Sequence, residues 1–549
     1  MKGSNLQIRT ALLLLVAFCG FLFFYGLGAF GLLGADEPRY AQIAREMLDR
    51  SEWVTPVLNG KPWLEKPPLY YWQAMLTYRV GRAFRVGRAF LPATDAVNEQ
   101  TARFPGAIDA TLMIAAIYLF LRRLRPGTEL DGALITASCA GVIGFAHAAA
   151  TDMPLAATFT IALLAWYAWY ECRQRAALAI FYLFLALGTL AKGPVAPALA
   201  AVIVVIFAAA KRDRHIVLNS LWLPGILLFL IVALPWYVAV QIRNPEFFRF
   251  FILEHNLARF STNVYHHPEP FWFFLPVFLL AVMPWTIWLI AALVERARQM
   301  WSEGWEAFSS PEDSWALFLL IWMLVPVLFF SASRSKLPGY ILPAVPAAAL
   351  LVTEYLSARR EKEIRLSRPL AAAHGILCGL LVFGALEAAS IAVTHHLAPG
   401  PWTYVAASIA LVIALAITIA LVTSAGPRLL RSATMIAVIV SVAAVIRFAA
   451  PAIDATQSAH PVAETIRGFS SEAVPVALYH INRIEQYGLE FYLNRATQSY
   501  ENGDIPAPAH VVVAMQGSQS QVAQLVPGRR VSYLTSIPAQ KLDLYWVGK

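Results

Sequence analysis

Acidic and basic side chains stand at the ends of several apolar segments, where a membrane protein would meet water. The acidic candidates are Asp36, Glu37, Glu65 and Asp152, and the basic candidates are Lys66, Lys192, Arg334 and Lys336. Cations stabilise a departing phosphate, while a carboxylate can face the positive charge that grows on a sugar ring. If these residues share one membrane surface, their mixture favours a reaction that expels a phosphate from a sugar.

Helix initiation is a simpler explanation for some of these residues. In "GADEPRYA", Asp36 is a good N-cap, Glu37 suits the positive end of a helix and Pro38 suits a first turn. Asp152 in "TDMPL" could likewise cap the helix that follows it. The adjacent charges in "WLEKPPLYYW" could be a solvated ion pair in a loop. Local sequence alone leaves both explanations open.

The overall composition indicates an integral membrane protein. Of the 549 residues, 58% are hydrophobic and only 14% are charged. Apolar segments close to the length of a membrane span, about 20 residues, recur along the chain and predict about 13 transmembrane helices. These segments are 11–33, 104–121, 132–149, 153–170, 177–191, 195–210, 221–240, 271–293, 315–332, 340–356, 370–393, 402–423 and 433–450.

Basic loops predict the orientation of this α-helical polytopic membrane protein. Lys and Arg gather in every second gap between the apolar segments, as in "RRLRP", "KRDR" and "ARREKEIRLSR", and such loops stay in the cytoplasm. The N-terminus is then cytoplasmic, and loops 34–102 and 242–270 and the C-terminal tail lie outside it. Lys192 and Lys336 fall on the outer side, although lysines in short loops prefer the cytoplasmic side. Their position suggests that they bind an anion there. The net charge of +9 comes mostly from these cytoplasmic loops, so it does not indicate a nucleic-acid partner.

Two domains follow from the change in composition near the C-terminus. Residues 1–451 form the membrane domain, and residues 452–549 alternate β-rich runs with helical stretches, which predicts a small outer α/β domain. In loop 34–102, apolar residues of 36–48 line one helix face, so this helix is expected in the membrane interface. Further along, every third residue is basic in a stripe expected to attract an anionic acceptor lipid, namely Arg79, Arg82, Arg85 and Arg88.

A metal site and a buried carboxylate are the remaining polar features. His266 and His267 in "YHHPEP" could bind a divalent ion such as zinc with Glu65 or Glu269, although adjacent histidines rarely ligate one ion together. We therefore expect no required cofactor. Asp109 lies inside an apolar segment and should meet a neighbouring helix or a cavity.

Several short motifs resemble the bacterial 4-amino-4-deoxy-L-arabinose (L-Ara4N) transferases that modify lipid A. They are "DEPRYA", "EKPPLYYW", "TDMP", "AKGP", "HPEPFWFFLPV" and "SKLPGYILP". These enzymes are C-type glycosyltransferases (GT-C fold), as are the protein O-mannosyltransferases, and the resemblance covers about residues 5–360. It implies periplasmic transfer of the sugar from undecaprenyl phosphate to a lipid A phosphate in the bacterial inner membrane, with resistance to polymyxin and cationic peptides.

The same resemblance implies roles for individual residues. The family's acidic residues fall on Asp36 and Asp152, its loop lysine on Lys66, and its later outer turn on Lys336 and Tyr340. We expect catalysis from Asp36, Asp152 and Glu37, and substrate binding from Arg39, Tyr40, Glu65, Lys66, Lys192, Lys336, Tyr340, Arg82 and Arg85.

The sequence leaves two rival functions open. One keeps the fold but moves another sugar, such as mannose, or uses a protein hydroxyl as the acceptor. The other is a lipid or drug transporter, which would favour polar residues at mid-bilayer and repeated membrane segments. Here the charged residues are expected at one surface of the membrane, and the membrane segments show no sequence repeat. Both features favour the transferase over the transporter.

Overall fold

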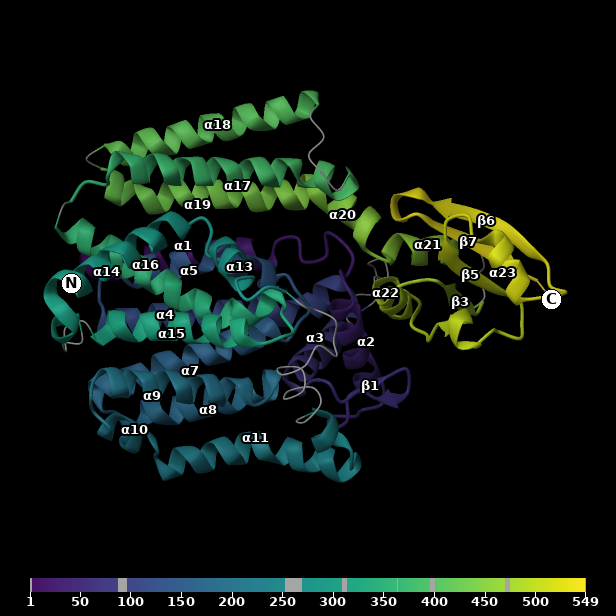
Figure 1. The fold of residues 1–549 in the computed structure, drawn as a ribbon, viewed down its shortest axis with the longest axis horizontal. Helices are drawn as coiled ribbons and strands as arrows, with labels where there is room; N and C mark the ends of the chain where they lie inside the picture. The colour runs from purple at the N-terminus through teal and green to yellow at the C-terminus, as the bar shows by residue number, and fades with distance from the viewer. Residues whose placement is uncertain are drawn as a thin grey trace.

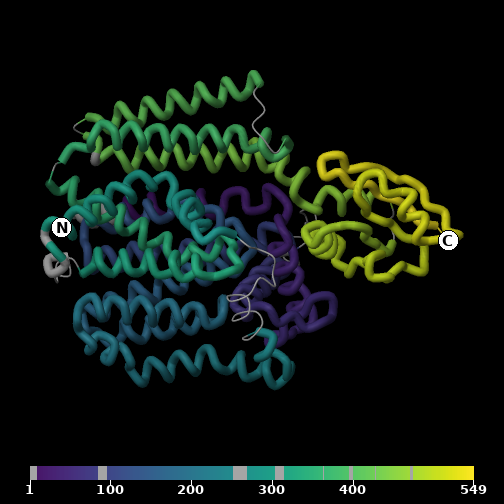
Figure 2. The backbone as a smooth tube through the Cα atoms, viewed as in Figure 1, coloured from purple at the N-terminus to yellow at the C-terminus, as the bar shows by residue number. Residues whose placement is uncertain are grey.

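The computed structural model describes residues 2–86, 96–251, 269–308, 314–362, 364–394, 400–423, 425–469 and 474–548. Most of the helices run side by side in one long bundle, and a small domain stands at one end of it (Figure 1). The chain begins at the far end of the bundle and finishes in the small domain, as the tube in Figure 2 shows.

Long apolar helices form the bundle. Nine helices of the described ranges are long and apolar enough to cross a membrane. They are α4 (Glu99–Leu124), α7 (Asp152–Cys172), α8 (Arg175–Lys192), α11 (Leu223–Arg243), α15 (Ser314–Ala332), η3 (Pro338–Ala344) with α16 (Val345–Glu361), α17 (Arg368–Thr394), α18 (Pro401–Val422), and α19 (Gly426–Ala444) with η4 (Val445–Ala449) and α20 (Ala450–Gln457). The predicted polytopic helical membrane fold is confirmed.

Bent and short helices account for the rest of the predicted segments. Helix α5 (Glu129–Ala137) meets α6 (Ala140–Ala146) at 64°, and α13 (Phe274–Ala281) meets α14 (Thr286–Phe308) at 113°. Counting each pair as one span gives up to 11 in the described residues. The shorter helices are α1 (Lys2–Cys19) with η1 (Gly20–Phe24), α9 (Val195–Ala210) and α10 (His215–Ser220). Each apolar segment predicted from the sequence therefore contains a helix.

Ion pairs join the basic loops at one end of the bundle. Asp131 near the start of α5 pairs with Arg360 from α16 and with Arg431 from α19. Arg125 and Glu171 pair at 2.5 Å across the ends of α4 and α7. Loops that the sequence predicts to share one membrane side thus meet in space.

The first outer loop and the C-terminal domain occupy the opposite end. The loop contains α2 (Asp36–Asp49), a short hairpin of β1 (Val57–Leu58) and β2 (Lys61–Pro62), and α3 (Leu69–Val86). The domain contains α21 (His460–Phe469), β3 (Val476–Tyr479), α22 (Arg483–Leu493), β4 (Gln498–Ser499), η5 (Tyr500–Asn502), β5 (His510–Met515), α23 (Gln519–Leu525), β6 (Val531–Ile537), η6 (Pro538–Gln540) and β7 (Leu542–Val547). Its sheet has the order β4-β3-β5-β7-β6, with β3 parallel to β4 and β5 and with β7 antiparallel to β5 and β6.

Protein, rather than lipid, covers the apolar face of α2. Tyr40, Ile43 and Met47 are buried in one core with residues of α3 and of the C-terminal domain. On the same helix, Arg45 is buried and its Nη1 donates to the carbonyl of Phe491 in α22 at 2.7 Å. Amphipathicity predicts that this face must be buried but does not say by what, and here it packs on protein. The position of α2 relative to the membrane interface stays a prediction.

Candidate active site

A polar pocket opens where the bundle meets the first outer loop. Its volume is about 280 Å³. It is lined by Asp36, Arg39, Tyr40, Glu65, Lys66, Phe145, Ala150, Thr151, Asp152, Lys192, Leu337, Pro338, Gly339 and Tyr340. The structure therefore brings together most of the predicted site residues from five separate parts of the chain.

Asp36 is the first residue of α2 and faces the pocket. The N-cap position of the helix is occupied by Ala35, and no side-chain capping hydrogen bond is formed there. The Asp36 side chain is 51% exposed and its carboxylate pairs with Arg39, one turn further along. Asp36 thus does not act as the N-cap, and its carboxylate is available to the pocket.

Arg39 gives the pocket a permanent positive charge. Its guanidinium lies against Asp36 and is 3.7 Å from the Glu65 carboxylate. Burial opposes the charge, but the neighbouring Tyr40, Asp36 and Glu65 outweigh it and raise the pKa of the guanidinium further. Burial and the charge of Asp36 also raise the pKa of the Tyr40 hydroxyl, which therefore stays protonated.

Asp152 and Lys192 form the second charged pair of the pocket. Asp152 is the first residue of α7, and its Oδ1 lies 2.5 Å from Nζ of Lys192 at the end of α8. Lys192 Nζ also lies 4.7 Å from the centre of the Tyr340 ring. A Cβ on Gly339 would meet Oδ1 of Asp152 at 2.3 Å, so a side chain there would displace the carboxylate. The turn between α15 and α16 thus packs directly onto the acidic group.

Glu37 lies behind the pocket, where it joins two segments of the site. Its carboxylate accepts hydrogen bonds from the backbone N–H of Leu33 and of Ala149, both at 2.7 Å. It also accepts from Nη2 and Nε of Arg103 at 2.8 and 3.1 Å. Arg103 is fully buried and further donates to the carbonyls of Leu27, Phe30 and Gly31. Glu37 was predicted to be catalytic, but this geometry fits a residue that holds the Asp36 segment beside the Asp152 segment.

Lys336 and Arg82, which the sequence predicts to bind substrate, do not line the polar pocket. Lys336 is buried, and its Nζ donates to the carbonyls of Ser333 and Glu269 at 2.6 and 3.0 Å. Arg82 is exposed on α3 and pairs with Asp49 at 2.7 Å. Lys336 thus donates to backbone carbonyls. The sequence shows a lysine at this position but does not show whether it binds a backbone carbonyl or an anion. Arg334, close to Lys336 in the chain, is exposed.

Other predicted residues fall outside what the structure describes. These are His266, His267, Arg88 and the side chain of Arg85. In the described parts of the chain, no three His, Cys, Asp or Glu side chains gather as metal ligands. The zinc site with Glu65 therefore stays a prediction. Asp109 meets α3 as expected, because Nε2 of Gln73 donates to both its carboxylate oxygens at 2.9 and 3.1 Å.

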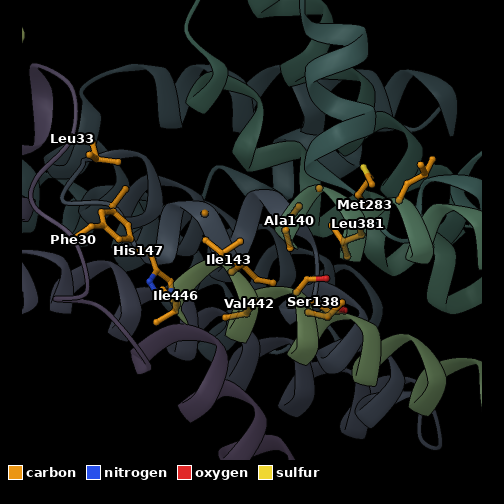
Figure 3. Close-up of a pocket in the computed structure, with 18 of the residues that line it drawn as sticks. Phe30, Leu33, Ser138, Ala140, Ile143, His147, Met283, Leu381, Val442 and Ile446 are labelled. Atoms are coloured by element: carbon orange, nitrogen blue, oxygen red, sulfur yellow. The ribbon is translucent and has the colours of Figure 1, made fainter. Parts of the chain in front are cut away.

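An apolar cavity of about 780 Å³ lies next to the polar pocket. Figure 3 shows its wall, to which Phe30 and Leu33 contribute from the chain before α2, Ile143 from α6 and Ile446 from η4. Glu37 and Ala148 line the cavity, whereas their close neighbours Asp36 and Ala150 line the polar pocket. The two spaces are therefore separated by only a short length of chain.

Sequence reasoning missed Arg103, Trp63 and Tyr487. Arg103 carries a weak signal, because it is a charged residue at the start of an apolar segment. Trp63 and Tyr487, which flank Arg39, are ordinary aromatic residues in a chain that is 12% aromatic. Their sequence positions carry no sign that they meet.

Known proteins resemble the chain in sequence and fold. Residues 65–238 match the family described as dolichyl-phosphate-mannose-protein mannosyltransferase. The chain is 34% identical over 357 residues to an undecaprenyl phosphate-alpha-4-amino-4-deoxy-L-arabinose arabinosyl transferase of Pseudomonas aeruginosa, covering 64% of this chain and 60% of that one. A transferase of the same name from Serratia proteamaculans is 28% identical over 384 residues, covering 68% and 65%. The matches thus span less than two thirds of these relatives' length.

Solved structures show the same architecture over nearly the whole chain. ArnT from Cupriavidus metallidurans bound to undecaprenyl phosphate has a TM-score of 0.74 at 21% identity, with 97% of each chain covered. The apo form of that protein has a TM-score of 0.73 at 20% identity, with 98% of each chain covered. The chain therefore has the fold of these solved structures and is similar in sequence to the undecaprenyl phosphate-aminoarabinose arabinosyl transferases.

Proposed function

We propose that the protein transfers 4-amino-4-deoxy-L-arabinose from undecaprenyl phosphate to a phosphate of lipid A and so protects the cell from polymyxin and cationic peptides. The observation that carries this proposal is the polar pocket. It sets Asp36 and Asp152 among the cations of Arg39, Lys66 and Lys192. The similarity to undecaprenyl phosphate-aminoarabinose arabinosyl transferases supports this donor and this sugar.

The reaction needs the two kinds of charge that the pocket offers. The bond between the sugar's anomeric carbon and the donor phosphate oxygen breaks, and a new bond forms from that carbon to an oxygen of the acceptor phosphate. Lys66 and Lys192 stabilise the undecaprenyl phosphate as it leaves. Asp36 faces the positive charge on the ring and can hold the sugar's ammonium group. A lipid A phosphate is already an anion, so no strong general base is needed.

The neighbouring cavity suits the lipid part of a substrate. Its walls are largely apolar and its volume is about 780 Å³, enough for a hydrocarbon chain while the phosphate reaches the polar pocket. The loop positions of the pocket residues support a site at the periplasmic membrane surface, with the N-terminus in the cytoplasm of a bacterial inner-membrane protein.

A hydroxyl acceptor is the second candidate, favoured by the match of residues 65–238 to protein mannosyltransferases. In that reaction the acceptor must lose a proton, and Asp36 or Asp152 would act as the general base. The same pocket would serve, so the acceptor has to be identified by experiment.

The test is mass spectrometry of lipid A from cells that lack the gene and cells that express it. We expect aminoarabinose on lipid A only with the wild-type gene. Asp36→Asn should reduce transfer by about a hundredfold or more, because it removes one electrostatic contact to the transition state. Asp49→Asn, at the exposed far end of the same helix, is the matched control and should transfer normally. Sugar on protein with unmodified lipid A would favour the second candidate, and no sugar on either would refute both.

A further inference from the structure

Three aromatic rings surround the guanidinium of Arg39. The distances from its central carbon to the ring centres are 5.2 Å for Tyr40, 5.1 Å for Trp63 and 5.4 Å for Tyr487. All lie within the range of about 6 Å over which a cation is attracted to a ring face. Tyr40 belongs to α2 and Trp63 to the loop before α3, whereas Tyr487 belongs to α22 of the C-terminal domain. We call Tyr40, Trp63 and Tyr487 the aromatic cage.

Packing, rather than a full set of hydrogen bonds, holds Arg39 in the cage. Only 11% of its side-chain surface is exposed. Its Nε is buried and has no hydrogen-bond acceptor among the described residues. Trp63 and Tyr487 also contact each other edge to face, with ring centres 6.4 Å apart and planes at 82°. The rings therefore define where the guanidinium lies.

Several hydrogen bonds attach α22 firmly to the chain around the pocket. The backbone N–H of Leu32 donates to the hydroxyl of Tyr492 at 2.8 Å. Asn59 of the first outer loop donates to the Glu490 carboxylate at 2.9 Å. With the bond from Arg45 to the carbonyl of Phe491, these contacts fix the helix that carries Tyr487.

We propose that Tyr487 of the C-terminal domain is a positioning residue for transfer: with Trp63 it holds Arg39 against Asp36 and Glu65, and this sets the direction of the Asp36 carboxylate. This inference rests on the proposed function for its effect on rate. Misplacing a catalytic group by about 1 Å can cost on the order of a hundredfold in rate. The C-terminal domain then contributes to the geometry of the pocket by holding Arg39, which lines it.

Carboxyl labelling of the purified full-length protein tests the cage without any need for activity. A water-soluble carbodiimide with an amine nucleophile labels exposed carboxylates, and peptide mass spectrometry reads the rate at each one. Removing the ring in Tyr487→Leu should release Arg39 and raise labelling of Asp36 several-fold. Arg39→Gln should give the same rise, and the double variant should give no more, because both changes remove one interaction.

Built-in controls keep this test decisive. Asp49 is 47% exposed and paired with Arg82, so its labelling should not change. Tyr487→Phe retains the ring and should behave as the wild type. An unchanged rate at Asp36, an equal rise at Asp49, or additive effects of the two substitutions would overturn the cage.

Kinetics with undecaprenyl phosphate-aminoarabinose and lipid A test the effect on rate. In Tyr487→Leu, kcat should fall about tenfold or more while KM for the donor changes less than about twofold, because geometry rather than binding is lost. Tyr533→Leu, an exposed tyrosine on β6, should be unaffected. An active wild type with unchanged kcat in Tyr487→Leu would overturn the positioning role. If the wild type transfers no sugar, the proposed function fails, and the labelling still decides whether the cage holds Arg39.

Discussion

Asp36 and Glu37 are adjacent carboxylates with different environments. Asp36 is half exposed in the pocket, whereas Glu37 is buried and accepts hydrogen bonds from two backbone N–H groups and from Arg103. The sequence predicts both as acidic residues at a helix start, but it cannot say which one turns toward solvent. Successive side chains on an α-helix point in directions about 100° apart, so Asp36 and Glu37 face different surroundings.

Replacement of Glu37 should therefore damage the fold, unlike replacement of Asp36. Glu37→Gln leaves the buried guanidinium of Arg103 without its counter-charge, and breaking such a pair costs on the order of 3 kcal/mol. Thermal unfolding of purified protein should show a clearly lower Tm for Glu37→Gln, while Asp36→Asn stays close to the wild type. Equal Tm values for Glu37→Gln and the wild type would show that the Arg103 contact does not support the fold.

At the scale of elements, apolar length is the property that sequence predicts well. The predicted segments all contain helices because a chain in lipid must satisfy its backbone hydrogen bonds internally. Contacts between outer elements are harder to predict. The pattern of α2 indicates a buried face but not its partner, α22, which follows more than 400 residues later. Asp36, Asp152 and Lys192 were predictable because each is a charged residue beside an apolar segment, and Lys66 because it lies in a recognisable motif. Trp63 and Tyr487 carry no such signal.

The junction between α20 and α21 should make stability depend on pH. Nδ1 of His460 lies 3.2 Å from the Asp454 carboxylate, which also accepts from the N–H of Gly31 at 2.7 Å. The hydrogen bond to Asp454 raises the pKa of His460. Burial lowers this pKa, whereas the charges of Asp454, Glu99 and Glu464 add to the rise. Since the folded pKa lies above the unfolded one, the stabilisation is complete below about pH 6.5 and is lost as pH rises through the folded value.

As pH rises from about 6.5 through the folded pKa of His460, we expect the Tm of the wild type to fall more than the Tm of His460→Gln does. His215→Gln changes an exposed histidine at the start of α10; it is the matched control and should keep the wild-type pH dependence. Parallel curves for the wild type and His460→Gln would show that the Asp454 contact contributes nothing to stability.

The whole molecule has two chemically different ends. Ion pairs between basic loops join one end of the bundle, with Asp131, Arg360 and Arg431 at a shared contact. The C-terminal domain stands at the other end (Figure 1). The polar pocket is lined there by the start of α2. This polarity was predictable from the alternation of basic loops. The contact between Tyr487 of the C-terminal domain and Arg39 of the pocket was not predictable, because a compositional change marks a domain boundary without indicating what the domain contacts.

Membrane orientation is the prediction that belongs to this scale. Short basic loops remain in the cytoplasm, so the end with Asp131 and Arg360 should face inward. A reporter that is active only in the periplasm should work when fused after Lys549 and fail when fused after Arg212, between α9 and α10. A reporter that is active only in the cytoplasm should show the reverse pattern. The opposite result would place the polar pocket on the cytoplasmic side, where a periplasmic transfer to lipid A could not use it.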